Sequence, residues 1–264
     1  MRIKYVNSED VRGHIREFNN FISDNFNKFN HEDNPELILV TGGDGSMLKG
    51  IFDNYHNNIP VIGRASGTLN FLLSDFKDNE KDILEGITSD EIKVEVVSAT
   101  TLSVSINGND DNFAINEIAI GGDFMDYFDF EVITEDGYFD NFHFRGQGIS
   151  ISTPLGSTGL NLNAEGKILQ INDREGNSNK SLSIVNHISN KKINEVFIGC
   201  KTVIKVKAGR GETARLYLDG KRKIIELKNG DVITVDIGKD IQIAFLDERE
   251  FNKKRIDFAH KKRV

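Results

Sequence analysis

The residues best suited to chemistry lie between Leu37 and Gly50, where an apolar run leads into a glycine-rich turn carrying one carboxylate, Asp44. The run from Leu37 to Val40 predicts a buried parallel strand. The glycines of the turn, Gly42 to Gly45, are expected to adopt backbone angles closed to other residues and to let another molecule approach the main chain. Helical spacing follows, and the free N–H groups of a helix start favour phosphate.

Asp44 is the unusual residue of this turn, because an acid repels phosphate unless a metal ion or a hydroxyl lies between them. We therefore interpret Asp44 as a general base or as an aid to metal binding. From this stretch alone, the alternative is a plain strand-to-helix turn in which Asp44 caps the helix. The turn is not a Walker A loop, which would end in Gly-Lys-Ser/Thr, and it lacks the glycine spacing of a Rossmann fingerprint.

A second candidate site is the pair Asn116 and Glu117, which interrupts the strand-like run from Phe113 to Ile120. Neighbouring strand residues face opposite sides, so one of the pair should point inward. A buried amide or carboxylate is costly unless it is hydrogen-bonded. Two interpretations stay open: a bulge or strand end at the surface, or a pair that holds the vicinal hydroxyls of a sugar.

A third candidate site is the stretch from Arg145 to Gly166, where a strand runs into a turn dense in hydroxyls and glycines. Ser157 or Thr158 could cap a short helix there. Converging hydroxyl and N–H groups suit a polar ligand, although an elaborate turn would have the same composition.

Composition narrows the class of protein. The chain has 264 residues, of which 38% are hydrophobic and 28% charged, as in folded globular proteins. No stretch is apolar enough for a membrane span or a signal peptide. The net charge of −8 argues against nucleic acid, and the six scattered histidines argue against structural zinc. Cys200 is the single cysteine, which leads us to expect a reducing, cytoplasmic setting.

Periodicity predicts two domains. Residues 1–97 alternate strand and helix patterns, which predicts an α/β N-terminal domain with a parallel sheet covered by helices. Ligands of such sheets bind at the carboxyl ends of strands, where Gly42 to Gly45 and Arg64 to Phe71 both fall. From Ile92 onward, apolar residues recur at every second position, as in strands. This spacing predicts a β-rich, sandwich-like C-terminal domain over residues 98–238. Residues 239–264 are expected to return to the first domain, and their basic end is expected to be a solvated face or a phosphate-facing edge.

The expected strands and turns can be placed along the chain. Helices are expected from Glu9 to Phe26, after Gly45 and from Asp78 to Ile87, with Ser8 and Asp78 as caps. Two-residue turns are expected at Asn107-Gly108, Asp219-Gly220 and Asn229-Gly230. Strands are expected at Ile3–Val6, Ile59–Gly63, Ile92–Val96, Leu102–Ile106, Phe113–Ile120, Phe128–Thr134, Asn141–Arg145, Gly148–Ser152, Val196–Gly199, Thr202–Val206, Ala214–Leu218, Ile224–Leu227, Val232–Ile237 and Ile241–Leu246.

Taken together, these stretches resemble the NAD kinase family. The family's Gly-Gly-Asp-Gly turn matches Gly42 to Gly45, and its Gly-x-Leu-Gly-Phe loop matches Gly67 to Phe71. Its Asn-Glu pair matches Asn116-Glu117, and its Thr-Pro-x-Gly-Ser-Thr-Ala-Tyr run matches Thr153 to Leu160. The order and spacing agree over nearly the whole chain. The glycine turn alone is shared with lipid kinases and phosphofructokinases, so the Asn-Glu and Thr-Pro motifs carry the resemblance.

The resemblance implies a kinase that moves the γ-phosphoryl group of ATP, or a phosphoryl group of polyphosphate, to the 2′-hydroxyl of the adenosine ribose of NAD, giving NADP. Asp44 would be the general base, and a divalent cation such as Mg²⁺ would neutralise charge. Members are cytosolic homodimers or homotetramers built through their β-rich portions, so a neighbouring subunit could complete the site. Neither nucleic acid nor a membrane is implied as a partner.

The resemblance also assigns site residues. The phosphate-binding residues would be Gly42, Gly43 and Gly45. The residues that would bind NAD are Asp44, Gly45, Lys49, Phe71, Asn116, Glu117, Arg145, Gln147, Thr158, Gly159, Leu160, Asn161, Leu162 and Asn163.

Four residues depart from the family pattern. Gln147 stands where the family has Asp, Gly159-Leu160 stands for Ala-Tyr, and Asn70 stands for a glycine. A lost aromatic contact costs about 0.5–1.5 kcal/mol beyond area burial. We therefore expect retained chemistry with weaker NAD binding or a shifted ligand preference. Two alternatives are a lipid or sugar kinase that shares the turn, and a nucleotide-binding sensor with weak or no kinase activity.

Overall fold

The computed structural model describes residues 1–6, 13–25, 33–65, 71–76, 79–123, 125–134, 141–173, 175–198, 202–207 and 213–262. The chain divides into two compact units. Unit 1 comprises Met1–Ser98 with Ile241–Val264, and unit 2 comprises Ala99–Asp240. Among the described residues, no helix is long and apolar enough to cross a membrane.

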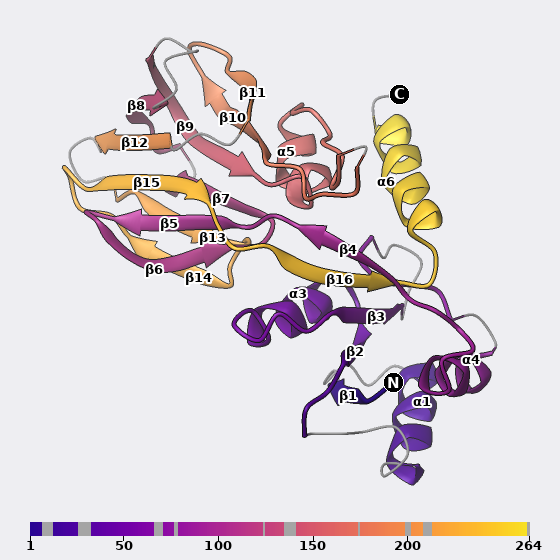
Figure 1. The fold of residues 1–264 in the computed structure, drawn as a ribbon. Helices are drawn as coiled ribbons and strands as arrows, with labels where there is room; N and C mark the ends of the chain where they lie inside the picture. The colour runs from indigo at the N-terminus through magenta and orange to yellow at the C-terminus, as the bar shows by residue number, and fades with distance from the viewer. Residues whose placement is uncertain are drawn as a thin grey trace. The chain divides into compact units, whose positions relative to one another are not determined.

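Unit 1 is an α/β unit, as predicted (Figure 1). Its sheet has the strand order β1-β2-β3-β16-β4, and the described pairings of β1 with β2, β2 with β3 and β16 with β3 are parallel. The strand β16 therefore returns to the first sheet after unit 2 is complete. The elements are β1 (Ile3–Val6), α1 (Gly13–Asp24), β2 (Leu37–Gly42), α3 (Asp44–Asp53), β3 (Val61–Ala65), α4 (Glu80–Thr88), β4 (Glu95–Ala99), β16 (Ile241–Phe245) and α6 (Glu248–Lys262).

The strand β2 is buried along its whole length, which explains its continuous apolar run. Leu37 and Leu39 face the core that includes Phe18 and Ile22 of α1. Val40 lies under helix α3, because a Cβ added to Gly50 of that helix would be 2.5 Å from a Val40 methyl group. Glycine at position 50 thus lets α3 pack closely on β2 and holds the first turn of the helix at the end of the strand.

Unit 2 is one extensive antiparallel sheet, with strand order β14-β13-β7-β9-β8-β12-β15-β5-β6 and β10 and β11 as a branch on β9. Lys223 Nζ donates to Asn112 Oδ1 at 2.6 Å, which links β14 to β6 and shows that the sheet curls. The elements are β5 (Leu102–Ile106), β6 (Asn109–Ala114), β7 (Glu117–Gly121), β8 (Phe128–Thr134), β9 (Phe142–Ser152), η1 (Gly156–Thr158), α5 (Leu160–Asn163), β10 (Ser181–Ser189), β11 (Asn194–Ile198), β12 (Thr202–Lys207), β13 (Arg215–Leu218), β14 (Lys223–Glu226) and β15 (Val232–Ile237).

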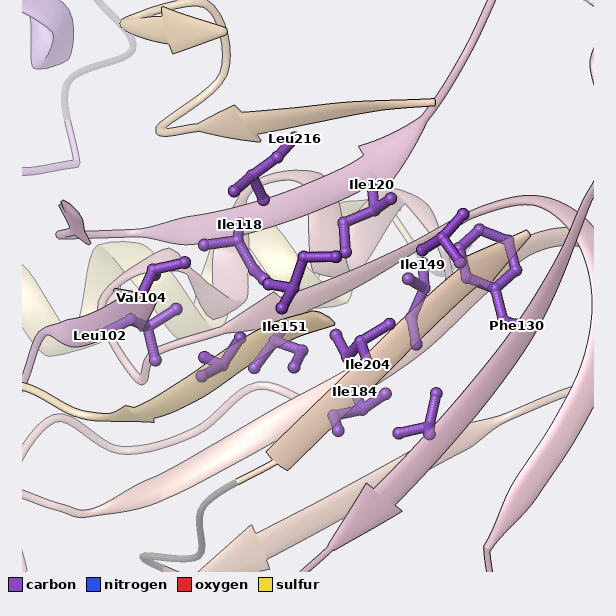
Figure 2. Packing of buried hydrophobic residues seen from close by; sticks show 14 of the residues in the cluster. Leu102, Val104, Ile118, Ile120, Phe130, Ile149, Ile151, Ile184, Ile204 and Leu216 are labelled. Carbon is purple, nitrogen blue, oxygen red and sulfur yellow. The ribbon is translucent and has the colours of Figure 1, made fainter. Parts of the chain in front are cut away.

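The core of unit 2 is formed by alternate residues of these strands. Figure 2 shows side chains from several strands pointing toward one another, among them Ile118 of β7, Ile151 of β9 and Ile204 of β12. Burying such alternating side chains is the largest favourable contribution to folding. The same alternation places the intervening residues on the other face of the sheet.

Two predicted hairpin turns are confirmed by their backbone angles. Asn107 and Gly108 have φ of 54° and 81°, and Asp219 and Gly220 have φ of 46° and 69°. Both residues of each turn therefore occupy the left-handed region. Asn107-Gly108 directly joins the paired residues Ile106 and Asn109, whereas Asp219 and Gly220 begin a longer connection, 219–222, between the paired residues Leu218 and Lys223. The hairpin predicted at Asn229-Gly230 is wrong, because β14 pairs with β13 while β15 pairs with β12 and β5.

Four sequence predictions about strands and helices need correction. The strand predicted over Ile92–Val96 lies further along the chain, as β4 (Glu95–Ala99), which buries Val97 and Ala99 and leaves Val96 48% exposed. The two strands predicted on either side of Gly146 are one strand, β9. Strand β10 was missed, and the basic tail forms helix α6.

The errors in predicting β9 and β10 have different physical reasons. In β9, a Cβ at Gly146 would be 2.8 Å from Ser189 Cβ, so glycine permits close pairing here instead of ending the strand. In β10, polar residues such as Ser183 and Asn186 are buried by tertiary contacts, which hides the alternation. The predicted caps Ser8 and Asp78 lie outside the described residues, and α4 has Asn79 at its N-cap.

Candidate functional site

The glycine turn of unit 1 joins β2 directly to α3. Gly42 has φ of 137°, a conformation that side-chain-bearing residues rarely adopt. Gly43 has φ of −109°, and Gly45 has no positive φ. The expectation of special backbone angles thus holds for Gly42 only. Among the described residues, a Cβ added to Gly45 would meet nothing within 4 Å, so no described side chain fills the space on this side of the residue.

The start of α3 offers unpaired N–H groups. Ser46 and Met47 donate to the carbonyl oxygen of Gly43, at 3.0 and 3.1 Å. Among the described residues, the backbone N–H groups of Gly43, Asp44 and Gly45 have no backbone carbonyl acceptor. Helix N-terminal amides carry partial positive charge, so this turn can receive an anionic group such as phosphate.

The carboxylate of Asp44 is fixed by the main chain of a segment 27 residues later. Its Oδ1 accepts the N–H groups of Phe71 and Leu72, both at 2.9 Å, whereas Oδ2 accepts only Phe71 at 3.2 Å. Asp44 makes no side-chain bond to the helix start, because Gly43 occupies the N-cap position. Burial raises the pKa of the Asp44 carboxyl above its ordinary value, and the two N–H groups oppose part of this rise.

The segment that holds Asp44 is itself clamped to β3. Ser74 donates its N–H to the Gly63 carbonyl at 2.8 Å, and its carbonyl accepts the N–H of Ala65 at 2.9 Å. Its hydroxyl accepts the N–H of Leu246 at 3.1 Å. The position of Phe71 and Leu72 therefore depends on the sheet, which makes the Asp44 carboxylate a pre-organised group.

The remaining predicted residues of unit 1 take other places. Lys49 is exposed and pairs with Asp53 at 2.8 Å along the helix. Phe71 supplies its backbone N–H to Asp44. Gly67 to Asn70, the rest of the predicted loop, lie outside the described residues.

In unit 2, Asn116 lies in a break between β6 and β7, and Glu117 begins β7. The Thr153 hydroxyl donates to the carbonyl oxygens of Ile115 and Asn116, at 2.8 and 3.1 Å. The N–H of Thr153 also donates to the Asn116 carbonyl, at 2.8 Å. The structure thus brings the second and third predicted stretches together at the junction of β7 and β9.

Gly156 shows how close this approach is. A Cβ at this position would lie 2.2 Å from the carbonyl oxygen of Asn116 and 2.5 Å from its carbonyl carbon. Real Cβ atoms do not approach backbone this closely, so only glycine fits here. The Gly156 N–H donates to the Thr153 hydroxyl at 3.1 Å, which completes the junction.

The side chains of Asn116 and Glu117 retain unused polar capacity. The buried Oδ1 of Asn116 has no hydrogen-bond partner within the described chain. Burial, with a smaller contribution from the charge of Asp219, raises the pKa of Glu117 to about 7. A Cβ at Gly159 would be 3.6 Å from Glu117 Oε2, so Gly159 borders this carboxylate. Unsatisfied polar groups of this kind are suited to a ligand with hydroxyl groups.

The residues after Gly159 divide into structural and exposed positions. Asn161 is fully buried, and its amide donates to the carbonyls of Ser157 and Lys167, at 3.0 and 2.9 Å. Its Oδ1 accepts the Ser183 hydroxyl at 2.7 Å, so this side chain has a structural role. Leu162 is also buried, whereas Leu160 is 37% exposed and free to contact a ligand.

Arg145 and Gln147 lie far along β9 from the Asn116-Glu117 pair. Ser152 pairs with Glu117, and Gly148 pairs with Gly121 at the other end of β7. At about 3.3 Å per residue, Gln147 is roughly 17 Å and Arg145 roughly 23 Å from Ser152. The structure therefore does not bring these two residues to the pair within unit 2.

Sequence reasoning missed one residue of this region. Asp219 was predicted only as part of a hairpin turn, yet its carboxylate binds the amides of Ile115, Asn116 and Glu117. The Asp-Gly dipeptide gave the turn, but nothing in the sequence indicated where its side chain points.

Comparison with known proteins identifies relatives of the chain. It is 30% identical over 228 residues to a protein named NAD kinase from Flavobacterium psychrophilum, covering 82% of this chain and 74% of that protein. It is 30% identical over 220 residues to an NAD kinase from Christiangramia forsetii, covering 80% and 70%. The match to an NAD kinase of Ureaplasma parvum is 31% identical over 166 residues, 62% of this chain, and spans 57% of the relative. No family model matches the chain.

Solved structures share the fold. A yeast NADH kinase complexed with NADH has a TM-score of 0.71 at 18% identity, covering 96% of this chain and 86% of that chain. An NAD kinase from Archaeoglobus fulgidus in complex with ATP has a TM-score of 0.70 at 18% identity, covering 98% and 99%. At this level of identity, the likeness establishes the fold.

Proposed function

This chain belongs to the NAD kinase family, and we propose that it transfers the γ-phosphoryl group of ATP to the 2′-hydroxyl of the adenosine ribose of NAD. The products are NADP and ADP. The proposal is supported by the names of the relatives and by the two groups of residues described above.

The observation that best supports this chemistry is the hydrogen bonding and raised pKa of the Asp44 carboxylate. Oδ1 is anchored by two N–H groups, while among the described residues Oδ2 accepts only the longer bond from Phe71. A partly buried carboxylate with a raised pKa is a better proton acceptor than one in water. In the proposed reaction, Asp44 takes the proton of the 2′-hydroxyl as its oxygen attacks the γ-phosphorus, and the bond to the β-phosphate oxygen breaks.

The turn that carries Asp44 also accounts for phosphate binding. Among the described residues, the N–H groups of Gly43, Asp44 and Gly45 have no backbone acceptor, and a Cβ at Gly45 would contact none of these residues. Phosphoryl transfer depends mainly on positioning and on stabilising negative charge, which these amides supply. We assign Gly42, Gly43 and Gly45 to the phosphates.

Unit 2 supplies the groups that bind a ribose. The carboxylate of Glu117 and the unsatisfied Oδ1 of Asn116 accept hydrogen bonds from vicinal hydroxyls. Gly159 and the exposed Leu160 border the same region, and we assign them with Thr158 and Asn163 to the wall of the nucleoside site. For Asn161 and Leu162, whose side chains are buried, we assign only a supporting role.

We propose that the divalent cation arrives with the phosphoryl donor. Among the described residues, no group of three or more His, Cys, Asp or Glu side chains could hold a metal ion. Mg²⁺ commonly keeps several waters and binds substrate phosphates, so the phosphates of ATP can bring the cation into the site. Such a cation neutralises charge on the transferred group.

We further propose a homodimer or homotetramer. Arg145 and Gln147 lie roughly 17–23 Å along β9 from Ser152, so they do not serve the Asn116-Glu117 pair of their own chain. A neighbouring copy offers them a second nucleotide site to contact. We also propose a cytoplasmic setting, because the chain has one cysteine, Cys200, and so cannot form an internal disulfide.

The proposed function is tested by coupled detection of NADP from NAD, ATP and magnesium. We expect NADP to form and to depend on both substrates. Tight nucleotide binding without NADP would favour a sensor, and phosphorylation of a lipid or sugar instead of NAD would favour another kinase. Replacing ATP with polyphosphate in the same assay identifies the donor.

The raised pKa of Glu117 predicts that NAD binding weakens in acid. Hydroxyl groups of the ribose donate to the carboxylate, so binding needs the deprotonated form. Below the pKa of about 7, the KM for NAD should rise toward tenfold for each pH unit. The pH profile of KM checks this, and Glu117→Gln should have a flat profile at a high KM. An unchanged wild-type KM between pH 8 and pH 6 would contradict the assignment.

The same pKa affects folding with a defined sign. Between the ordinary pKa of 4.5 and the folded value of about 7, the folded chain holds a proton on Glu117 that the unfolded chain has lost. The free energy of unfolding should therefore fall as pH rises through this window. Comparing the melting temperatures of wild type and Glu117→Gln across the window isolates this contribution.

A further inference from the structure

The turn between β13 and β14 contains a carboxylate that the proposed reaction does not use. The side chain of Asp219 is 1% exposed. The residue has φ of 46°, and aspartate is among the few side-chain-bearing residues that accept this conformation. A buried carboxylate is costly unless it is paired and hydrogen-bonded, so its partners explain its position.

These partners are the amides of three consecutive residues at the break between β6 and β7. The Asp219 carboxylate accepts the N–H of Ile115 at 2.9 Å, of Asn116 at 2.7 Å and of Glu117 at 3.3 Å. In return, the N–H of Asp219 donates to the Glu117 carbonyl at 3.0 Å. A turn about a hundred residues later in the chain thus holds the backbone of the break from one side.

Arg222 completes the arrangement. Its Nε donates to Asp219 Oδ2 at 3.0 Å, and its guanidinium lies 5.1 Å from the ring centroid of Phe113. Thr153 holds the carbonyls of Ile115 and Asn116 at 2.8 and 3.1 Å. The amides and the carbonyls of the break are therefore bound by two different elements, which fixes the directions of the Asn116 and Glu117 side chains.

Asp219 also bears the charge that acts on Glu117. Its negative charge, after burial, raises the pKa of Glu117. On the β9 side, neither the strand from Gly148 to Ser152 nor the segment from Thr153 to Asn163 contains an ionisable side chain. On the other side, β13 carries Arg215, which pairs with Asp123 and Glu226. Arg222 forms an ion pair with Asp219 at 3.0 Å, so its positive charge lies next to that carboxylate.

We propose that Asp219 is a positioning residue for NAD, holding the Asn116-Glu117 backbone in the shape that presents both side chains to the ribose. This inference rests on the proposed function. Asp219 acts through the break and does not touch the reacting atoms. Its loss should therefore weaken NAD binding more than it slows the chemical step.

The test compares Asp219→Asn with wild type in the kinetic assay and in calorimetric titration with NAD. We expect KM and Kd for NAD to rise about tenfold or more while kcat changes by less than threefold. The matched control is Asp231→Asn, because Asp231 accepts the N–H of Lys228 at 2.8 Å in another turn of unit 2. A folded Asp219→Asn variant with wild-type KM and Kd would overturn the proposal.

The pH profile distinguishes positioning from mere stability. Asp219→Asn removes a negative charge beside Glu117, which should lower the pKa of Glu117. As the pH is decreased, the KM for NAD should therefore begin to rise at a lower pH than in wild type. Arg222→Gln leaves Asp219 without its cation, so that pH should move up. Opposite shifts support the proposal, and shifts that are absent or in the same direction overturn it. If Asp219→Asn does not yield folded protein, Arg222→Gln alone tests the proposal. An upward shift of the pH at which its KM begins to rise supports the proposal, and any other result overturns it.

Different results would contradict the proposed function and the role of Asp219. Absence of NADP formation by wild type counts against the proposed function. The role of Asp219 is then decided by the NAD titration, in which an unchanged Kd for a folded Asp219→Asn variant counts against it.

Discussion

Asp44→Asn is expected to lower kcat by about 10²–10⁴-fold, the usual contribution of a positioned general base. The amide has nearly the shape of the carboxylate, and its oxygen can still accept the N–H groups of Phe71 and Leu72. It cannot accept a proton from a hydroxyl at neutral pH. The KM for NAD and the melting temperature should therefore change little.

The control for this variant is Asp53→Asn in the same helix. Asp53 pairs with Lys49 on the exposed side of α3, at 2.8 Å. An exposed pair of this kind contributes at most about 1 kcal/mol to stability, so kcat should stay near wild type. If Asp44→Asn turned over at a rate close to wild type, Asp44 would not be the base.

Gly156→Ala is expected to disrupt unit 2 more than an ordinary surface substitution. The added methyl group would lie 2.2 Å from the Asn116 carbonyl oxygen, and this atom is backbone, so a side-chain rotation cannot relieve the overlap. Overpacking costs about 1–3 kcal/mol and sometimes more. Since Asn116 must move, the KM for NAD should also rise by about tenfold or more.

Thermal unfolding and NAD kinetics check this expectation together. Gly45→Ala is the comparison for stability alone, because its methyl group would meet none of the described residues within 4 Å. Its melting temperature should equal or exceed that of wild type, given the higher helix propensity of alanine. A Gly156→Ala variant as stable as wild type, with an unchanged KM, would show that the close approach at Gly156 is not required.

Local sequence determined the parts of the protein whose signals lie within a few residues. The apolar run of β2, the glycines after it and the helical spacing of α3 placed Asp44 at a strand-to-helix turn before any contact was known. The turns at Asn107-Gly108 and Asp219-Gly220 followed from the same short-range preference for left-handed angles. Such features depend on backbone sterics and are legible in a single stretch of chain.

Tertiary structure decided what depends on residues distant in sequence. The anchoring of Asp44 by Phe71 and Leu72 requires the clamp of Ser74 on β3. The inward face of β4 and the continuity of β9 are set by their neighbouring strands. The partners of Asp219, about a hundred residues earlier in the chain, appear only when β13 pairs with β7. Sequence patterns give the type of each element, but the direction of a buried polar side chain depends on which distant backbone groups need a partner, and only the folded chain determines this.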